Sequence, residues 1–391
     1  MSEPIVIVGA GQAGIKAAET LRMKGHDGDI LLVGEEIWPP YQRPPLSKAY
    51  LKGELSEDRL FLKAADYYEK AKIALITGSR VAAIDPMGHN LTFADGRIQS
   101  WSKLLLATGT RARTLPLSGG DLDGVFSLRG IDDTKRIGNT LETAQSVAII
   151  GGGYIGMEFA AVARSLGKQV TVIEAQDRVL KRSVAPEISR FVQRLHEARG
   201  VRLALGKGVA CIAGSDRVEG VELASGDIVS ADLVLVAAGA VPVTELAEAA
   251  GIAVERGIVV DDACRTSAPD IFAAGDCTIF PSRRYGRRIG LESVQNASDQ
   301  GKAAALSMLG EETAYDPVPW FWSDQYDVKL QIAGLSAGYD RTELVGDAGE
   351  GRFALRYFSG DTLLAVDAIN DPRSHMMARK EIAVRDQALA A

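Results

Sequence analysis

The same local pattern occurs twice in this chain. Residues 5–18 read IVIVGAGQAGIKAA, and residues 147–160 read VAIIGGGYIGMEFA. Each stretch begins with an apolar, β-branched run typical of a buried parallel strand, continues with glycines at G-x-G-x-x-G spacing, and ends with helical apolar periodicity. This repeat predicts an α/β fold with two Rossmann-like dinucleotide-binding domains.

The glycines of each motif have separate physical roles. Gly9 permits the tight turn, Gly11 lets the backbone approach a pyrophosphate, and Gly14 lets the helix pack closely on the strand. The free N–H groups at the start of the helix carry partial positive charge and face the phosphates. The second motif repeats this spacing with Gly151, Gly153 and Gly156.

A carboxylate follows each motif at the end of the next predicted strand. Glu35 and Glu174 lie about 20 residues beyond their glycines, where they can accept hydrogen bonds from ribose hydroxyls. Glu174 favours NADH over NADPH because a carboxylate repels a 2′-phosphate. Arg178 and Arg182 follow shortly after and leave NADPH open as an alternative. The chain is therefore expected to bind two dinucleotides and to pass electrons from one to the other.

Composition excludes several other classes of protein. A net charge of −7 argues against a general nucleic-acid binder. Cys211, Cys264 and Cys277 lie far apart and form no CxxC pair, which argues against a disulfide framework or a thioredoxin-like site. No apolar run approaches the ~20 residues that span a bilayer, and the start Met-Ser-Glu-Pro is unlike a secretory signal. We expect a cytoplasmic protein without membrane or nucleic-acid partners.

Two motifs point to other chemistry but lack the required context. GLSAG at 334–338 matches the G-x-S-x-G nucleophile elbow, and His375 lies downstream. The elbow requires a helix directly after the serine, whereas the following YDRTEL predicts a turn and a strand. The four histidines show no metal-ligand spacing, so no metal site is expected.

Five further stretches give the chain a resemblance to a known family. With both glycine motifs, they resemble the two-dinucleotide-binding flavoprotein reductases, and among these the oxygenase-coupled ferredoxin reductases. The resemblance implies noncovalent FAD in the first site, NADH in the second, and electron transfer to a [2Fe–2S] ferredoxin that feeds a Rieske dioxygenase or cytochrome P450. The stretches are RPPLSK at 43–48, LLLATGT at 104–110, IFAAGDC at 271–277, ESVQNASDQGKAA at 292–304 and FWSDQYD at 321–327.

Other electron acceptors remain open. A rubredoxin, or a small quinone or radical, would suit the same chemistry, and a redox-gated interaction protein similar to apoptosis-inducing factor is a further alternative. The disulfide reductases of this superfamily carry a redox cysteine pair near the first helix. Here no cysteine precedes Cys211, and residues 44–47 read PPLS. A thiol relay is therefore excluded, and Cys277 is expected to be a small buried residue.

The resemblance also implies the residues that bind the two cofactors. Arg43 would reach the FAD phosphates or adenosine, Asp276 would bind the ribityl chain, and the helix beginning at Val294 and Gln295 would face the flavin. The FAD set is Gly9, Gly11, Gly14, Glu35, Arg43, Lys48, Thr108, Gly109, Arg111, Asp276, Val294 and Gln295, and the NAD set is Gly151, Gly153, Gly156, Glu158, Glu174 and Gly239.

Three residues are implied to act in catalysis. Lys48 would lie near the flavin and pair with Glu158, which follows Gly156 on the second predicted helix. Trp322 would stack at the edge of the flavin or the nicotinamide. The plainer alternatives are a surface lysine, a carboxylate that stabilises a helix start, and a core or interface tryptophan.

The expected domain order places the NAD domain within the FAD domain. Hydrophobic alternation over 353–358 and 363–369 predicts antiparallel strands in a small α+β domain at the C-terminus. The predicted divisions are residues 1–113 and 241–316 for the FAD domain, 114–240 for the NAD domain, and 317–391 for a C-terminal interface-type domain.

One basic segment is a candidate docking site for the electron acceptor. PSRRYGRRIG at 281–290 is predicted to form a loop between Asp276 and Gln295. Its positive field would attract and orient an acidic ferredoxin, although a solvated loop is the plain alternative. The four charges belong to Arg283, Arg284, Arg287 and Arg288.

Overall fold

The computed structural model describes residues 3–390, which form two compact units. The short segment Arg43–Glu57 belongs to the second unit, although the chain on both sides of it belongs to the first. Unit 1 comprises Met1–Gln42, Asp58–Arg111 and Val241–Pro319, and unit 2 comprises Arg43–Glu57, Ala112–Ala240 and Trp320–Ala391.

Unit 1 is built on a parallel five-stranded sheet in the order β19-β7-β1-β2-β3. Its central strand reads IVIV and is buried along its whole length, as a parallel strand covered on both faces requires. The strands are β1 (Ile5–Val8), β2 (Ile30–Val33), β3 (Ile73–Ile76), β7 (Lys103–Leu106) and β19 (Ile271–Ala273).

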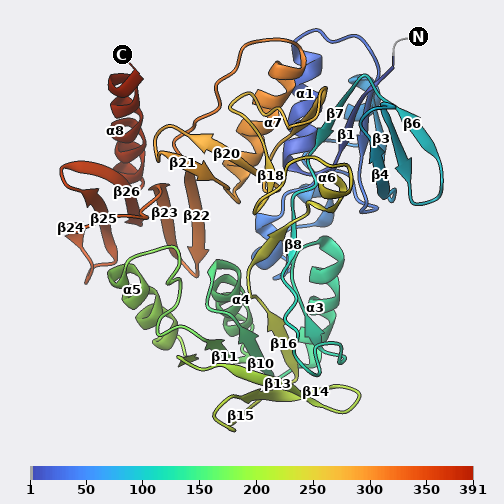
Figure 1. Cartoon of the computed structure of the whole chain (residues 1–391). Helices are drawn as coiled ribbons and strands as arrows, with labels where there is room; N and C mark the ends of the chain where they lie inside the picture. The colour runs from blue at the N-terminus through green and yellow to red at the C-terminus, as the bar shows by residue number, and fades with distance from the viewer. Residues whose placement is uncertain (1–2, 391) are drawn as a thin grey trace. The chain divides into compact units, whose positions relative to one another are not determined.

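Two helices of unit 1 pack against each other and lie side by side in Figure 1: α1 (Gln12–Met23) and α7 (Val294–Met308). A Cβ at Gly301 would lie 2.5 Å from the carbonyl oxygen of Ala13, so only glycine permits this approach. α7 begins with an N-cap, because the Ser293 hydroxyl accepts from Asn296 N at 3.0 Å.

Unit 2 repeats the design with a parallel sheet in the order β12-β11-β10-β16-β9. The strand that precedes the glycines, β10, again has the next strand on one side and a later strand on the other, as β1 does in unit 1. The strands are β9 (Val125–Phe126), β10 (Ser146–Ile150), β11 (Gln169–Glu174), β12 (Val201–Leu205) and β16 (Leu233–Val236).

Unit 2 also contains an antiparallel sheet in the order β22-β23-β26-β25-β24, with α8 (Pro372–Ala390) against β26 and β23. Together with the two parallel sheets, this sheet confirms the predicted fold class. The GLSAG serine is followed by strand β24 and not by a helix, so no nucleophile elbow forms. The strands are β22 (Trp320–Gln325), β23 (Val328–Gly334), β24 (Arg341–Asp347), β25 (Arg352–Ser359) and β26 (Thr362–Ile369).

The remaining elements are mostly short. Among the described residues, no helix is long and apolar enough to cross a membrane. The helices are η1 (Pro44–Ser47), η2 (Glu57–Leu60), α2 (Tyr67–Lys70), α3 (Ile131–Thr143), α4 (Tyr154–Ser165), α5 (Pro186–Glu197) and α6 (Glu245–Ala249). The strands are β4 (Val81–Asp85), β5 (Asn90–Phe93), β6 (Ile98–Ser100), β8 (Thr110–Ala112), β13 (Val209–Gly214), β14 (Val218–Leu223), β15 (Ile228–Ser230), β17 (Ala240–Pro242), β18 (Ile258–Val259), β20 (Thr278–Ser282) and β21 (Arg287–Ile289).

The arginine-rich segment is only partly the loop that the sequence predicted, because Arg283 and Arg284 lie in a turn and Arg287 and Arg288 on a strand. β20 and β21 pair as an antiparallel hairpin, in which Ser282 lies opposite Arg287 and Pro281 opposite Arg288. The prediction was wrong for Arg287 and Arg288, because charged residues are compatible with an exposed strand whose backbone hydrogen bonds are satisfied by its neighbour.

A buried carboxyl group joins two parts of unit 2. Asp367 on β26 is 1% exposed, and Tyr357 on β25 donates a hydrogen bond to it. The same Tyr357 hydroxyl accepts from the Ala185 N–H, just before α5, at 3.0 Å. Burial raises the pKa of Asp367 to about 7, because the ionised form loses its hydration.

This raised pKa makes stability depend on pH. The folded state favours protonated Asp367, so this stabilisation is complete below the unfolded pKa of about 3.9 and is lost as pH rises through about 7. Asp367→Asn cannot ionise, so its melting temperature should fall less than that of the wild type between pH 5 and 8, as measured by thermal unfolding. Asp361→Asn, an exposed change in the adjacent turn, is the control. Parallel curves for wild type and Asp367→Asn would refute the assignment.

Candidate functional site

The first glycine motif forms a turn that other residues cannot adopt. Gly9 has φ +117°, and a Cβ there would overlap the carbonyl oxygen of Ala107, at the end of β7. A Cβ at Gly14 would overlap the carbonyl oxygen of Gly9. These two glycines are therefore required for the strand, the turn and the helix to pack.

The second motif has the same geometry in unit 2. Gly151 has φ +116°, and its Cβ would overlap the carbonyl oxygen of Ala237, after β16. A Cβ at Gly156 would overlap the carbonyl oxygen of Gly151. Gly151 N donates to Ile173 O at 2.8 Å, as the corresponding glycine in unit 1 does to the second strand there.

The middle glycine of each motif is different. Gly11 and Gly153 are the N-cap residues of α1 and α4, with extended backbone at φ −100° and −79°. A Cβ at either position would meet no protein atom within 4 Å. The protein fold does not need glycine at these positions, and each leaves open space beside the positive end of a helix. This space fits a pyrophosphate, so both turns fit a dinucleotide.

The two carboxylates that follow the motifs are held differently. The Glu35 side chain is 72% exposed, and its Oε1 lies 3.8 Å from Arg80 Nε. Glu174 is tied to its own turn, since it accepts from Gly152 N at 2.6 Å and from Gln176 N at 2.8 Å. Glu174 therefore lies directly beside the second glycine motif.

Arg178 is used to hold the backbone together. Its Nη1 donates to Val184 O at 2.8 Å and to Ser189 Oγ at 2.6 Å, and its Nη2 donates to Lys181 O at 3.2 Å. These bonds orient the guanidinium toward the segment that leads into α5. A guanidinium engaged in this way is a poor ligand for a 2′-phosphate. The other arginine that left NADPH open, Arg182, is exposed.

Most of the residues expected at FAD follow parallel strands of unit 1. Ligands of open α/β sheets bind beyond the carboxyl ends of the strands. Gly9, Thr108 and Asp276 follow β1, β7 and β19, which are neighbours in the sheet. Val294 and Gln295 begin α7.

Several of these residues also have contacts within the protein. Thr108 Oγ1 donates to Val243 O at 2.7 Å, and Gly109 O accepts from Val243 N at 3.0 Å. Gly109 has φ +68°, which favours glycine, and Arg111 forms an ion pair with Glu245. These contacts fix the chain that follows β7.

Two further expected residues lie in unit 2. Arg43 is the N-cap of η1 and donates to Arg129 O at 2.7 Å. Gly239, after β16, has φ +99° and accepts from Arg113 N at 2.9 Å. The structure therefore brings Gly239 to the same sheet edge as the second glycine motif.

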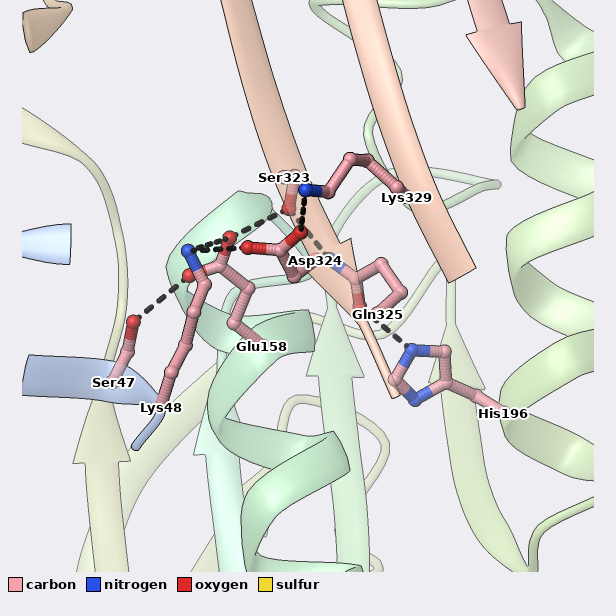
Figure 2. A network of polar contacts seen from close by, with 8 residues as sticks. All are labelled: Ser47, Lys48, Glu158, His196, Ser323, Asp324, Gln325 and Lys329. Atoms are coloured by element: carbon pink, nitrogen blue, oxygen red, sulfur yellow. Dashed lines mark hydrogen bonds and ion pairs between the residues drawn. The ribbon is translucent and has the colours of Figure 1, made fainter. Parts of the chain in front are cut away.

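A buried ion pair connects η1 to α4 in unit 2 (Figure 2). Lys48 Nζ lies 3.1 Å from Glu158 Oε1, and the Glu158 side chain is only 7% exposed. Ser47 Oγ donates to Glu158 Oε2 at 2.8 Å, and Ser323 Oγ donates to Oε1 at 2.7 Å. A buried charge is tolerated only when such donors replace its hydration. The side chain that sequence patterns placed at the helix start is therefore a desolvated carboxylate with three donors.

Lys48 lies between two carboxylates. Besides Glu158, Asp324 Oδ2 lies 3.6 Å from Lys48 Nζ, while the other oxygen of Asp324 lies 3.8 Å from Lys329 Nζ. The Lys48 side chain is 19% exposed. Its ammonium is therefore fixed near the surface of the network and is neither a free surface lysine nor fully enclosed.

Trp322 belongs to a row of aromatic residues on β22. Its ring stacks on Trp320 with centroids 5.7 Å apart, and Phe321 contacts Tyr154 of α4 at 4.8 Å. Trp322 is partly exposed. This arrangement leaves part of the ring available to a ligand while its neighbours hold it in place.

Besides Asp324 and Lys329, four residues of the network were missed by sequence reasoning. Ser47 lies in RPPLSK, and Ser323 and Gln325 lie in FWSDQYD, so both quoted stretches contained them without indicating what they contact. His196 carried no local signal at all. It is fully buried on α5 and meets Gln325 at 2.9 Å.

The arginine hairpin of unit 1 is interleaved with acids. Arg283 Nη2 lies 3.0 Å from Asp262 Oδ2, and Arg288 pairs with Glu255. Asp316 accepts from the backbone N–H groups of Arg283 and Arg284 at 3.1 and 3.3 Å. The local positive field is therefore weaker than four arginines alone would produce.

The thiols and possible metal ligands add no further site. Cys264 and Cys277 are buried, which confirms the expectation for Cys277, and Cys211 is partly exposed. Among the side chains that the structure describes, no cluster of three histidine, cysteine or acidic residues could hold a metal ion.

Two parallel sheets with dinucleotide-type turns define a two-site nucleotide-binding α/β protein. The model of the pyridine nucleotide-disulphide oxidoreductases matches residues 3–301, and that of the reductase C-terminal domain matches residues 320–391. The chain belongs to the pyridine nucleotide-disulphide oxidoreductase family. This membership confirms the predicted resemblance to flavoprotein reductases.

Named relatives cover nearly the whole chain. Rhodocoxin reductase of Rhodococcus erythropolis is 43% identical over 97% of this chain and 89% of its own length. Rubredoxin-NAD(+) reductase of Pseudomonas putida is 38% identical over 94% of this chain and 96% of its own. The crystal structure of the covalent putidaredoxin reductase–putidaredoxin complex matches with a TM-score of 0.95 and 38% identity, covering 97% of this chain and 93% of that one.

The glycine geometry gives a matched pair of variants. Gly11→Ala meets no protein atom, so we expect the melting temperature of the flavin-free protein to match that of flavin-free wild type. Bound flavin should be lost, measured by absorbance after gel filtration. Gly14→Ala overlaps backbone, so it should lower the free energy of unfolding by about 1–3 kcal/mol. Gly153→Ala should retain flavin and bind NADH more weakly. Flavin retention in Gly11→Ala would contradict the assigned pyrophosphate position.

Proposed function

We propose that this protein is an NADH-dependent ferredoxin reductase. It binds FAD at the glycine motif of unit 1 and NADH at that of unit 2, and it supplies electrons to a [2Fe–2S] ferredoxin that serves an oxygenase. The observation that carries this proposal is the repeated dinucleotide turn in a chain that has no cysteine before Cys211. Two nucleotide sites without a dithiol suit electron transfer from one cofactor to the other and then to an external carrier.

The residues of unit 1 fit FAD by their chemistry. The open space at Gly11 admits the pyrophosphate, the exposed Glu35 carboxylate suits the ribose hydroxyls, and Asp276 suits the ribityl hydroxyls. Bound FAD supplies the chemistry that accepts a hydride and releases electrons singly. The protein supplies binding, orientation and a fixed electrostatic environment.

The residues of unit 2 fit NADH. Gly153 leaves room for the pyrophosphate at the start of α4, and Glu174 lies beside this turn to accept from the adenosine ribose. Lys48 and Glu158 assist the hydride step, because Glu158 is on the helix that begins at this turn. Their pairing keeps one positive charge in a fixed position with little exposure to water.

The proposed domains follow from these assignments. Residues 1–113 and 241–316 form the FAD domain, 114–240 the NAD domain, and 317–391 an interface-type domain. The unit boundaries after Arg111, Ala240 and Pro319 support this division. The units depart from it in two respects, because Arg43–Glu57 groups with unit 2 and residues 320–391 share that unit with residues 112–240. The free cysteines are compatible with a reducing compartment, and we propose a cytoplasmic location.

A rubredoxin is the second candidate acceptor. The 38% identity to a rubredoxin-NAD(+) reductase favours it over small-molecule acceptors, and a rubredoxin is likewise reduced outside the flavoprotein. The [2Fe–2S] ferredoxin is preferred because the rhodocoxin reductase relative has the higher identity and the putidaredoxin reductase complex the matching fold.

Purified protein tests this function directly. We expect a yellow protein with about one FAD per chain that reduces a [2Fe–2S] ferredoxin with NADH, faster than with NADPH and faster than it reduces a rubredoxin.

The preference for NADH over NADPH should become smaller in Glu174→Ala combined with Ala175→Arg, because a repelling carboxylate is replaced by a phosphate ligand. Ratios of kcat/KM measure both preferences. A wild-type preference for NADPH or for rubredoxin would overturn the corresponding part.

The ion pair should act as one unit. Glu158→Gln and Lys48→Ala should each slow flavin reduction by NADH at least about tenfold, measured by stopped-flow absorbance, while FAD stays bound. The double variant should be no slower than the slower single variant, because both remove one interaction. Lys329→Ala, at the other oxygen of Asp324, is the control and should leave the rate unchanged. Additive effects would show that the two side chains act independently.

We propose that the arginine hairpin guides the ferredoxin. Arg283 and Arg288 have acidic partners, so the effect should concern the rate of encounter more than affinity. Ferredoxin reduction should slow as salt rises, and replacing Arg283, Arg284 and Arg287 by serine should flatten that dependence. Reduction of a small neutral dye is the control. Unchanged ferredoxin turnover at low salt in the triple variant would place docking elsewhere.

A further inference from the structure

Behind the ion pair, a chain of buried side chains extends from Glu158 to α5 (Figure 2). Ser323 Oγ, which donates to Glu158, accepts from Gln325 Nε2 at 2.9 Å. Gln325 Oε1 lies 2.9 Å from His196 Nε2. Ser323, Gln325 and His196 are all 0% exposed, so these side chains have no contact with bulk solvent. The network is therefore closed on the side away from Lys48.

The charge on Glu158 determines the direction of every hydrogen bond between Glu158 and His196. A carboxylate only accepts, so the single hydroxyl hydrogen of Ser323 must point to Glu158. Ser323 Oγ then needs a donor, and among the contacts of the described residues this donor is the amide nitrogen of Gln325. The amide oxygen consequently faces His196, and Nε2 of the imidazole must carry the hydrogen. A flipped amide would place its oxygen against an oxygen that has no hydrogen to give.

The imidazole meets this requirement as a neutral ring. The pKa of His196 is lowered to about 4, chiefly because the charged ring would lose its hydration on burial. The hydrogen bond to Gln325 opposes this shift, and the positive charge of Arg199 contributes to it. With Nε2 protonated, Nδ1 carries no hydrogen, and among the described residues it has no hydrogen-bond partner. Contact with Tyr326, whose ring centroid lies 4.9 Å away, holds the ring in place.

We propose that Ser323, Gln325 and His196 are positioning residues that hold the Glu158 carboxylate, and through it the Lys48 ammonium, in one orientation. This inference rests on the proposed role of the ion pair in the hydride step. Ser323 and Gln325 are two residues apart on β22 and share one face of the strand. His196 lies in the last turn of α5. Two elements, β22 and α5, thereby fix a charge carried by a third, α4.

The tautomer of His196 provides a test that does not depend on activity. In the NMR spectrum of protein labelled with ¹⁵N-histidine, the four histidine side chains give signals. The signals that disappear in His196→Gln belong to His196. We expect the neutral Nε2–H tautomer from pH 6 to 8. Lys48 and Ser323 both contact Glu158 Oε1, so in Glu158→Gln alone the amide oxygen should stay at this position and the His196 signals should not change. When Glu158→Gln is combined with Lys48→Ala, the amide nitrogen can donate to Ser323, the hydrogen-bond chain can reverse, and the His196 signals should move toward the Nδ1–H tautomer. An Nδ1–H tautomer in the wild type, or unchanged signals in this double variant, would overturn the inference.

Kinetics provide the second test. His196→Phe keeps the ring but removes the donor, and Ser323→Ala removes one oxygen. Each should slow flavin reduction by NADH about three- to tenfold, the effect of one lost hydrogen bond, without changing the NADH dissociation constant. His196→Gln places an amide nitrogen near Nε2 and should restore most of the rate. His375→Phe, the same exchange at a buried histidine outside the chain, should behave as wild type. If His196→Phe does not fold, the rate of flavin reduction in Ser323→Ala decides this test.

The outcomes separate this inference from the proposed function. If flavin in Glu158→Gln is reduced by NADH as fast as in the wild type, the ion pair has no role in the hydride step. The existence of the hydrogen-bond chain is then tested by the tautomer data alone. If Glu158→Gln is slow while Ser323→Ala and His196→Phe react as wild type, the ion pair acts without these positioning residues and the inference is wrong.

Discussion

Close backbone approach at two glycine turns is the constraint on which both parallel sheets depend. At Gly9 and Gly151 the chain leaves a central strand against the carbonyl oxygen that ends a neighbouring strand, and no side chain fits there. At the third glycine of each motif, the helix contacts the turn itself. The middle glycine makes no such contact, so each motif divides into positions that build the fold and one position that leaves space for a ligand.

A second organising interaction is the buried charge of Glu158. A carboxylate that is 7% exposed needs donors from its surroundings, and it obtains them from η1 and β22. Ser323, one of these donors, in turn accepts a hydrogen bond from Gln325, and the amide oxygen of Gln325 contacts His196. The orientation of side chains on four elements therefore depends on a single ionised group. This dependence explains why neutral, buried residues belong to a site whose chemistry concerns charge.

Charge near the surface follows a different rule. In the hairpin of β20 and β21, acids contributed by other parts of unit 1 pair with Arg283 and Arg288. Exposed pairs of this kind add little stability, but they reduce the field that a partner meets. Arg178 of unit 2 is likewise occupied, by backbone carbonyls and Ser189, and is thereby removed from the list of possible phosphate ligands. In both cases the residue type suggested a role that the neighbours altered.

The sequence alone determined the fold class, both nucleotide turns and the stretches that contain Lys48 and Glu158, because each depends on a short run of residues with a fixed local conformation. It did not determine the hairpin, the use of Arg178, or the chain from Glu158 to His196. His196 and Gln325 are 129 residues apart, and no local pattern records that they meet. Only the tertiary structure decided these partners, because a buried polar group must bond to whatever packing places beside it, however distant in the sequence.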